Sequence, residues 1–468
     1  MNKINRAYSL DALRGYAILT MVLSGTIAWG VLPGWMYHAQ VGPRSNFQFD
    51  PSIYGITWVD LVFPFFLFAM GAAFPFSIGS KYTKGVPKRK IVGDTLLRAF
   101  RLTFFAIFIQ HMYPHVVSSP EDVKSWLLAL LAFALMFPMF MRIPGNLSQR
   151  VRVGIQGMAY ALAILILCTV TYANNREFSL SFSNIIILVL ANMALFGSLI
   201  YLFTINKPWI RIAVLPLLMG VLLGSTVDES WTKAVFDFTP VDWFYKFNFL
   251  KYLFIIIPGT IAGEYLYSWI KTAETDITVG ERKLTPYILL ISFALIVVNV
   301  YSLYMRYLVF NLIATVFLLG LLYWLLRLKS RNTDYWRKMC VVGGYLLVLG
   351  LFFESFEGGI RKDYSTFSYY LVTSGLAFMA MIAFSILCDI YRVSAVTRPL
   401  VDAGQNPMIA YVAPQLVIIP ILHLTGLYSY LELLNQNAWL GFLRGVIITS
   451  LAIGLTMIFT RLKWFWRT

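Results

Sequence analysis

Apolar segments of about twenty residues recur from one end of the chain to the other, and each is long enough to cross a bilayer as an α-helix. Of the 468 residues, 59% are hydrophobic and only 13% are charged, which is about half the charged fraction of a soluble domain. Solidly apolar stretches such as 253–257 and 293–298 lack the alternation of barrel strands. We therefore expect an all-α polytopic integral membrane protein, with one transmembrane domain over residues 1–468 and no soluble domain.

The apolar segments predict a bundle of about twelve to fourteen membrane-spanning helices. The expected spans lie at residues 8–30, 56–79, 96–114, 125–141, 153–172, 184–204, 208–224, 249–271, 286–304, 308–327, 339–354, 366–388, 400–424 and 439–460.

The net charge of +16 comes from cations that cluster between the apolar segments. Such clusters are typical of cytoplasmic loops, so they indicate membrane orientation and not nucleic-acid binding. They predict cytoplasmic termini and a first loop, containing His38, on the outer side. Clusters that fit this orientation contain Lys81, Lys84, Lys88, Arg89 and Lys90; Arg142, Arg150 and Arg152; Arg327, Lys329, Arg331, Arg337 and Lys338; and Arg461, Lys463 and Arg467.

Two residues near the N-terminal end are candidates for chemistry. His38 lies in a short irregular loop between two apolar segments, where it is either an interfacial anchor or a catalytic imidazole. Asp60 lies near the start of the second segment, and an ionisable group near membrane depth is a functional candidate. Thr57 and Asp60 also have the spacing of a capping box, and a single carboxylate can fill both roles.

The start of the first segment carries a second group of polar residues. Asp11 and Arg14 are one turn apart, so they are expected either to pair with each other or to bind phosphate groups. Ser9 is the expected helix cap.

Two later segments are candidates for binding. The loop at 354–363 includes Arg361 and Lys362 and is either a binding loop for a polar substrate or a solvated connector. Asn406 precedes Pro407, which is typical of a helix start. The sequence contains no nucleotide-binding, hydrolase or metal-binding motif, and we expect no metal site.

Three segments near the N-terminal end together resemble the heparan-α-glucosaminide N-acetyltransferase family of transmembrane acyltransferases, including its bacterial NagX-type members. They are SLDALRG at 9–15, YHA at 37–39 and GITWVDLVFPFFLFAMG at 55–71. The likeness is sharpest over residues 8–80 and weaker over 354–424. The family core has about eleven spans, and where the animal enzymes have an asparagine late in the first span, this chain has Ser24 and Gly25.

The resemblance implies an enzyme that moves an acetyl group from cytoplasmic acetyl-CoA to the amine of a glucosamine-type sugar or glycan on the outer side. The corresponding positions imply catalysis by His38 and Asp60 and substrate contacts from Lys362 and Asn406. Arg361 of the same loop is a further expected substrate contact, and Arg14 and Asp11 are the expected CoA contacts on the cytoplasmic side. Because related bacterial proteins are described as N-acetylglucosamine transporters, the alternative is an inner-membrane sugar transporter without acyl transfer. The resemblance also implies a bacterial inner membrane, with the His38 loop in the periplasm, and a homodimer in contact with lipid.

The expected orientation is testable with single cysteines in a variant without native cysteines. A cysteine at Asn46 should react with an impermeant maleimide in cells whose outer membrane is permeabilised, whereas a cysteine at Lys84 should react only after the inner membrane is opened. The reverse labelling pattern would contradict the orientation.

Overall fold

The chain folds into a bundle of α-helices in a computed structural model that describes residues 6–141, 148–272, 278–328 and 330–467. No β-strand occurs in these ranges. The expected all-α polytopic membrane fold is therefore confirmed. Two predicted loop cations, Arg142 and Lys329, lie outside the described residues, as do residues 1–5 and 468.

Most of the helices follow one another with short connections; the longer ones join α1 to α2, α7 to α8 and α10 to α11. The helices are α1 (Tyr8–Thr26), α2 (Trp58–Ala72), α3 (Ser80–Thr83), α4 (Lys88–Met112), α5 (Pro114–Val117), α6 (Val123–Phe140), α7 (Gln149–Thr169), α8 (Ile185–Phe203), α9 (Pro208–Gly224), α10 (Trp231–Asp237), α11 (Leu253–Lys271), α12 (Val279–Met305), α13 (Leu308–Leu325), α14 (Arg331–Phe356), α15 (Phe367–Phe384), α16 (Ser394–Gln405), α17 (Pro407–Ala413), α18 (Ile419–Leu424), α19 (Tyr428–Glu432) and α20 (Ala438–Arg461).

Eleven helical segments of the described chain are long and apolar enough to cross a membrane. This count is below the expected twelve to fourteen, although helices do occupy the other three predicted spans. Those helices are α1 and α4, whose charged residues lower their mean hydropathy, and α9, which has only 17 residues.

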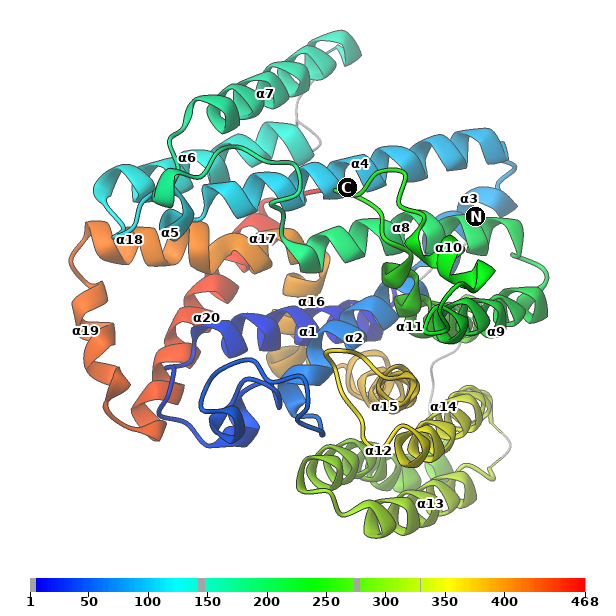
Figure 1. Cartoon of the computed structure of the whole chain (residues 1–468). Coiled ribbons are helices and arrows are strands. Elements are labelled where there is room, and N and C mark those ends of the chain that lie inside the picture. Colours follow the sequence, from blue (N-terminus) through cyan, green and yellow to red (C-terminus); the bar gives the residue numbers. More distant parts are fainter. Residues whose placement is uncertain (1–5, 142–147, 273–277, 329, 468) are drawn as a thin grey trace.

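The most buried helices lie at the centre of the bundle (Figure 1). The span that contains α15 is 94% buried, whereas the span formed by α7 is 17% buried and lies at the periphery. In Figure 1, α12, α13 and α14 lie beside α15 on one side, and α4, α6 and α7 lie on the other. Helices α1, α2 and α15 therefore form an inner scaffold between two outer groups.

Glycines let the inner helices approach one another closely. A Cβ added at Gly71 of α2 would lie 2.3 Å from the carbonyl oxygen of Ile256 in α11. Between α1 and α16, a Cβ at Gly15 would lie 1.7 Å from the Leu400 oxygen, and one at Gly404 would lie 1.8 Å from the Asp11 oxygen. Small residues at such crossings are a common basis of helix association in membranes.

Two sequence expectations about helix ends are wrong. Helix α1 begins after Ala7, not at Ser9, and the backbone N–H of Ser9 donates to the Asp389 carboxylate at 3.3 Å. The predicted span 400–424 is interrupted at Asn406, where α16 ends and α17 begins. Proline at the first position of α17 has no N–H to donate, so a new helix starts there easily.

We predict that Gly15→Ala or Gly404→Ala destabilises the protein by about 1–3 kcal/mol or more, because an added methyl group overpacks the contact between α1 and α16. Gly25→Ala, also in α1, is the matched control, since nothing lies within 4 Å of the added Cβ. Thermal unfolding in detergent measures the difference. Equal midpoints for the Gly15 and Gly25 variants would contradict this packing.

Candidate active site at one end of the bundle

The loop between α1 and α2 is folded around a buried tyrosine. The Tyr37 hydroxyl donates to the carbonyl of Ala28 at 2.8 Å and accepts from the backbone N–H of Leu32 at 3.0 Å. The Tyr37 ring also makes edge contacts with Trp29 and Phe47. Tyr37 therefore fixes the loop backbone directly before His38.

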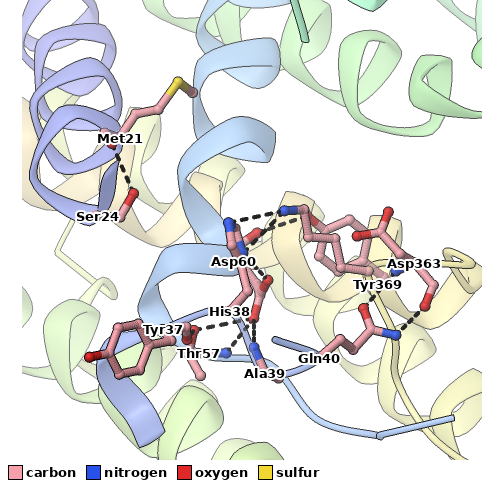
Figure 2. A network of polar contacts seen from close by, with 11 residues as sticks. Met21, Ser24, Tyr37, His38, Ala39, Gln40, Thr57, Asp60, Asp363 and Tyr369 are labelled. Carbon is pink, nitrogen blue, oxygen red and sulfur yellow. Dashed lines mark hydrogen bonds and ion pairs between the residues drawn. The ribbon is translucent and has the colours of Figure 1, made fainter. Parts of the chain in front are cut away.

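Asp60 holds His38 at the start of α2 (Figure 2). Its Oδ1 lies 2.8 Å from His38 Nδ1, while its Oδ2 accepts from the backbone N–H groups of Thr57 at 2.9 Å and Ala39 at 3.2 Å. The predicted capping box of Thr57 and Asp60 is present. One carboxylate thus caps the helix and orients the imidazole, so both roles considered from the sequence are filled.

The two members of the pair differ in their access to solvent. The Asp60 side chain is 2% exposed and that of His38 is 39% exposed. Because a carboxylate bound to Nδ1 favours the tautomer with the proton on that nitrogen, Nε2 carries the free lone pair. The arrangement therefore presents an imidazole nitrogen that can act as a base or a nucleophile.

A second loop, far away in sequence, completes the site. Lys362 Nζ lies 3.1 Å from Nδ1 and 3.4 Å from Nε2 of His38. The Gln40 side chain accepts from the backbone N–H of Asp363 at 2.9 Å and also donates to the Asp363 carbonyl. Figure 2 places Gln40 and Asp363 beside the His38 pair.

The central helix α15 supports the site from behind. The Tyr369 hydroxyl donates to the backbone carbonyl of Asp60 at 2.7 Å, and the Tyr369 side chain is fully buried. The first turn of α15 is capped by Glu357, whose carboxylate accepts from the N–H groups of Phe367 and Ser368. The pair is thus fixed to the inner scaffold of the bundle.

Two of the three predicted substrate-binding residues lie near His38, and the third does not. Lys362 contacts the imidazole, and the neighbouring Arg361 donates to the carbonyl of Pro51 at 3.4 Å. Asn406 is buried at the opposite end of α1, where its amide bonds to the carbonyl of Trp464 and the N–H of Trp466. These bonds hold the C-terminal segment in place. The Asn406 side chain caps neither α16 nor α17.

The predicted CoA contacts also lie far from His38. Asp11 and Arg14 pair at 3.6 Å near the start of α1, and Arg14 donates to the carbonyl of Gly404. Helix α1 runs on from Asp11 and Arg14 to Thr26, which is about 22 Å and 18 Å of helix before the His38 loop begins. The two groups of candidates therefore occupy opposite ends of the bundle.

Sequence reasoning missed Gln40 and Tyr369. A glutamine in a loop and a tyrosine in an apolar helix have no local pattern that marks a function. Only their partners, Asp363 and the Asp60 backbone, identify them. In the segment where the animal enzymes have an asparagine, the Ser24 hydroxyl donates to the Met21 carbonyl of its own helix at 2.9 Å and does not join the His38 site (Figure 2).

The fold and the site define a polytopic helical membrane protein with a histidine–aspartate pair at one end of its bundle. The chain belongs to the family described as "Domain of unknown function (DUF5009)", whose model matches residues 6–266, more than half of the 468 residues. The matched region includes His38, Gln40 and Asp60 but ends before Lys362. A comparison with curated proteins finds no match.

We predict that Asp60→Asn lowers the free energy of unfolding by about 1.5–3 kcal/mol, because a buried charged acceptor with three strong donors is lost. Asp50→Asn in the same loop is the control. Among the described residues, the Asp50 carboxylate bonds only to the exposed Ser52, and its loss should cost less than about 0.5 kcal/mol. Denaturation in detergent measures both variants, and equal stabilities would contradict the structural role of Asp60.

Proposed function

We propose that this protein is a membrane-bound acyltransferase that moves an acetyl group from acetyl-CoA to the amine of a glucosamine-type sugar or glycan. The observation that carries the proposal is the His38–Asp60 pair, in which a buried carboxylate orients a half-exposed imidazole. Proton transfer from an amine requires a base that works near neutral pH, and imidazole is such a base.

A cationic cavity supports binding of the CoA phosphates at the end of the bundle away from His38. The cavity has a volume of about 360 Å³ and is lined by residues that include Arg98, Arg101 and Lys81, which pairs with Asp94 of the same cavity at 2.6 Å. The buried Nε of Arg98 has no hydrogen-bond partner in the described part of the chain. Guanidinium groups with free donors suit phosphate oxygens. Arg98 and Arg101 therefore replace Asp11, whose carboxylate pairs with cations, as the better candidates for this contact.

A small apolar cavity supports a route between the two ends. It is lined in part by Met21, Phe63, Leu102 and Tyr411. Leu102 directly follows Arg101 of the cationic cavity, and Phe63 is one turn from Asp60. The cavity volume is about 30 Å³, so side chains such as Met21 and Phe63 must move to admit a pantetheine arm.

The reaction replaces the thioester C–S bond with an amide C–N bond. In direct transfer, His38 Nε2 removes a proton from the attacking amine, and the CoA sulfur leaves and takes up that proton. In a two-step route, Nε2 itself bonds to the acetyl carbon while the C–S bond breaks and the CoA thiolate leaves. The amine then displaces the imidazole, and the proton that the amine loses ends on the CoA sulfur. Both routes yield the N-acetylated sugar and free CoA.

The proposed orientation puts the His38 loop on the periplasmic face of a bacterial inner membrane, with both termini in the cytoplasm. The cation clusters at the opposite helix ends support it. We also propose that the protein forms a homodimer whose membrane spans contact lipid.

The alternative is a transporter of N-acetylglucosamine or a related sugar that performs no acyl transfer. Its support is three π-helical turns within or at the ends of spans, at Pro75–Gly79, Ser385–Ile390 and Pro414–Ile418. Such turns inside α-helices are frequent at functional sites, including binding sites. The His38–Asp60 pair favours the transferase because binding alone does not require an oriented imidazole.

We predict that purified wild-type protein transfers labelled acetyl groups from acetyl-CoA to glucosamine, and that His38→Ala lowers kcat at least about 10²-fold through loss of the base. His423→Ala is the matched control, because that ring stacks between Trp126 and Tyr428 outside the site.

The absence of acetyl transfer by wild type across several amino sugars, combined with accumulation of N-acetylglucosamine in proteoliposomes, would contradict the transferase. Full activity of the His38→Ala variant would contradict the role of His38 in the reaction.

A further inference from the structure

The contact between Lys362 and His38 is not explained by the helix-capping and orienting roles of Asp60. With Nδ1–H donated to Asp60, the imidazole offers Nε2 as its free acceptor, and the Lys362 ammonium lies beside the ring, 3.1 Å from Nδ1 and 3.4 Å from Nε2. No carboxylate lies within ion-pair distance of Lys362 among the described residues. A cation that is not paired with a carboxylate thus lies beside the imidazole, close enough to Nε2 to contact a group that reacts there.

Gln40 holds this lysine in place through the backbone of the next residue. Its amide group bonds to both the N–H and the carbonyl of Asp363, and the Gln40 side chain is 3% exposed. Gln40 is two residues from His38, and Lys362 directly precedes Asp363. The Gln40 amide therefore joins the histidine loop to the lysine loop across more than three hundred residues of sequence.

We propose that Lys362 is a catalytic residue that stabilises the oxyanion of the tetrahedral intermediate, and that Gln40 is the residue that positions it. The role depends on the proposed acyl transfer. When the amine or Nε2 attacks the acetyl carbon, the C=O electron pair moves to oxygen. It returns when the C–S bond breaks and the CoA thiolate leaves. A fixed ammonium group near Nε2 stabilises the transient negative charge on that oxygen.

Three substitutions test the role of Lys362. Lys362→Met should lower kcat about 10²–10³-fold with a smaller change in KM for acetyl-CoA, as expected for a group that stabilises the transition state. Lys362→Arg keeps the positive charge, so its kcat should be at least tenfold higher than that of Lys362→Met. Lys233→Met is the control, because Lys233 pairs with Asp228 at an exposed position.

A double-mutant cycle tests Gln40. Gln40→Ala should lower kcat about tenfold or more, and the Gln40→Ala, Lys362→Met double variant should be no slower than Lys362→Met alone. Gln48→Ala, an exposed glutamine in the same loop, should behave as wild type. Thermal midpoints close to that of wild type show that each variant is folded, and the Lys362→Arg recovery separates charge from folding.

The outcomes separate this role from the proposed function. If wild type transfers acetyl groups and Lys362→Met keeps its kcat, or if Lys362→Arg is as slow as Lys362→Met, the oxyanion role is overturned and the transferase stands. If the fall in kcat of the double variant equals the product of the two single-variant falls, Gln40 does not act through Lys362. If wild type transfers nothing, the reaction and the role fail together.

Discussion

The site depends on one buried carboxylate. A charge removed from water is costly unless hydrogen bonds replace its hydration, and the Asp60 carboxylate accepts from Thr57, Ala39 and His38. These donors come from the N-cap residue of α2 and from the preceding loop. Satisfying the carboxylate therefore fixes the helix start, the course of the loop and the orientation of the imidazole together.

The inner scaffold carries this constraint to the rest of the bundle. Tyr369 of the buried helix α15 binds the Asp60 carbonyl, and the glycine contact of α2 with α11 leaves little room for α2 to slide. The opposite end of α1 is packed just as closely against α16. The position of the His38 imidazole is therefore fixed by the packed helices, although His38 itself lies in a loop. General base or nucleophilic chemistry requires such a fixed position.

Much of the fold could be predicted from the sequence, because the cost of exposing a backbone to lipid forces apolar residues into helices of membrane length. Tertiary contacts decide the structure at other positions, and these could not be predicted from local sequence. The cap of α1 comes from Asp389 near the other end of the chain, and Asn406 serves the C-terminal segment instead of a helix start. The capping box at Asp60 was predictable because its partners are three residues apart, whereas Gln40 could not be recognised without Asp363.

From the 2.8 Å contact of Asp60 Oδ1 with His38 Nδ1, we infer that Asp60 sets the tautomer of His38 and leaves Nε2 free. Nitrogen-15 NMR of histidine-labelled protein at about pH 8, where most imidazoles are neutral, tests it directly, with His38→Gln assigning the signal. The account predicts a protonated Nδ1 and an unprotonated Nε2 in wild type, and the opposite tautomer in Asp60→Asn, because the asparagine amide donates to Nδ1. A proton on Nε2 in wild type, or a tautomer unaffected by Asp60→Asn, would contradict it.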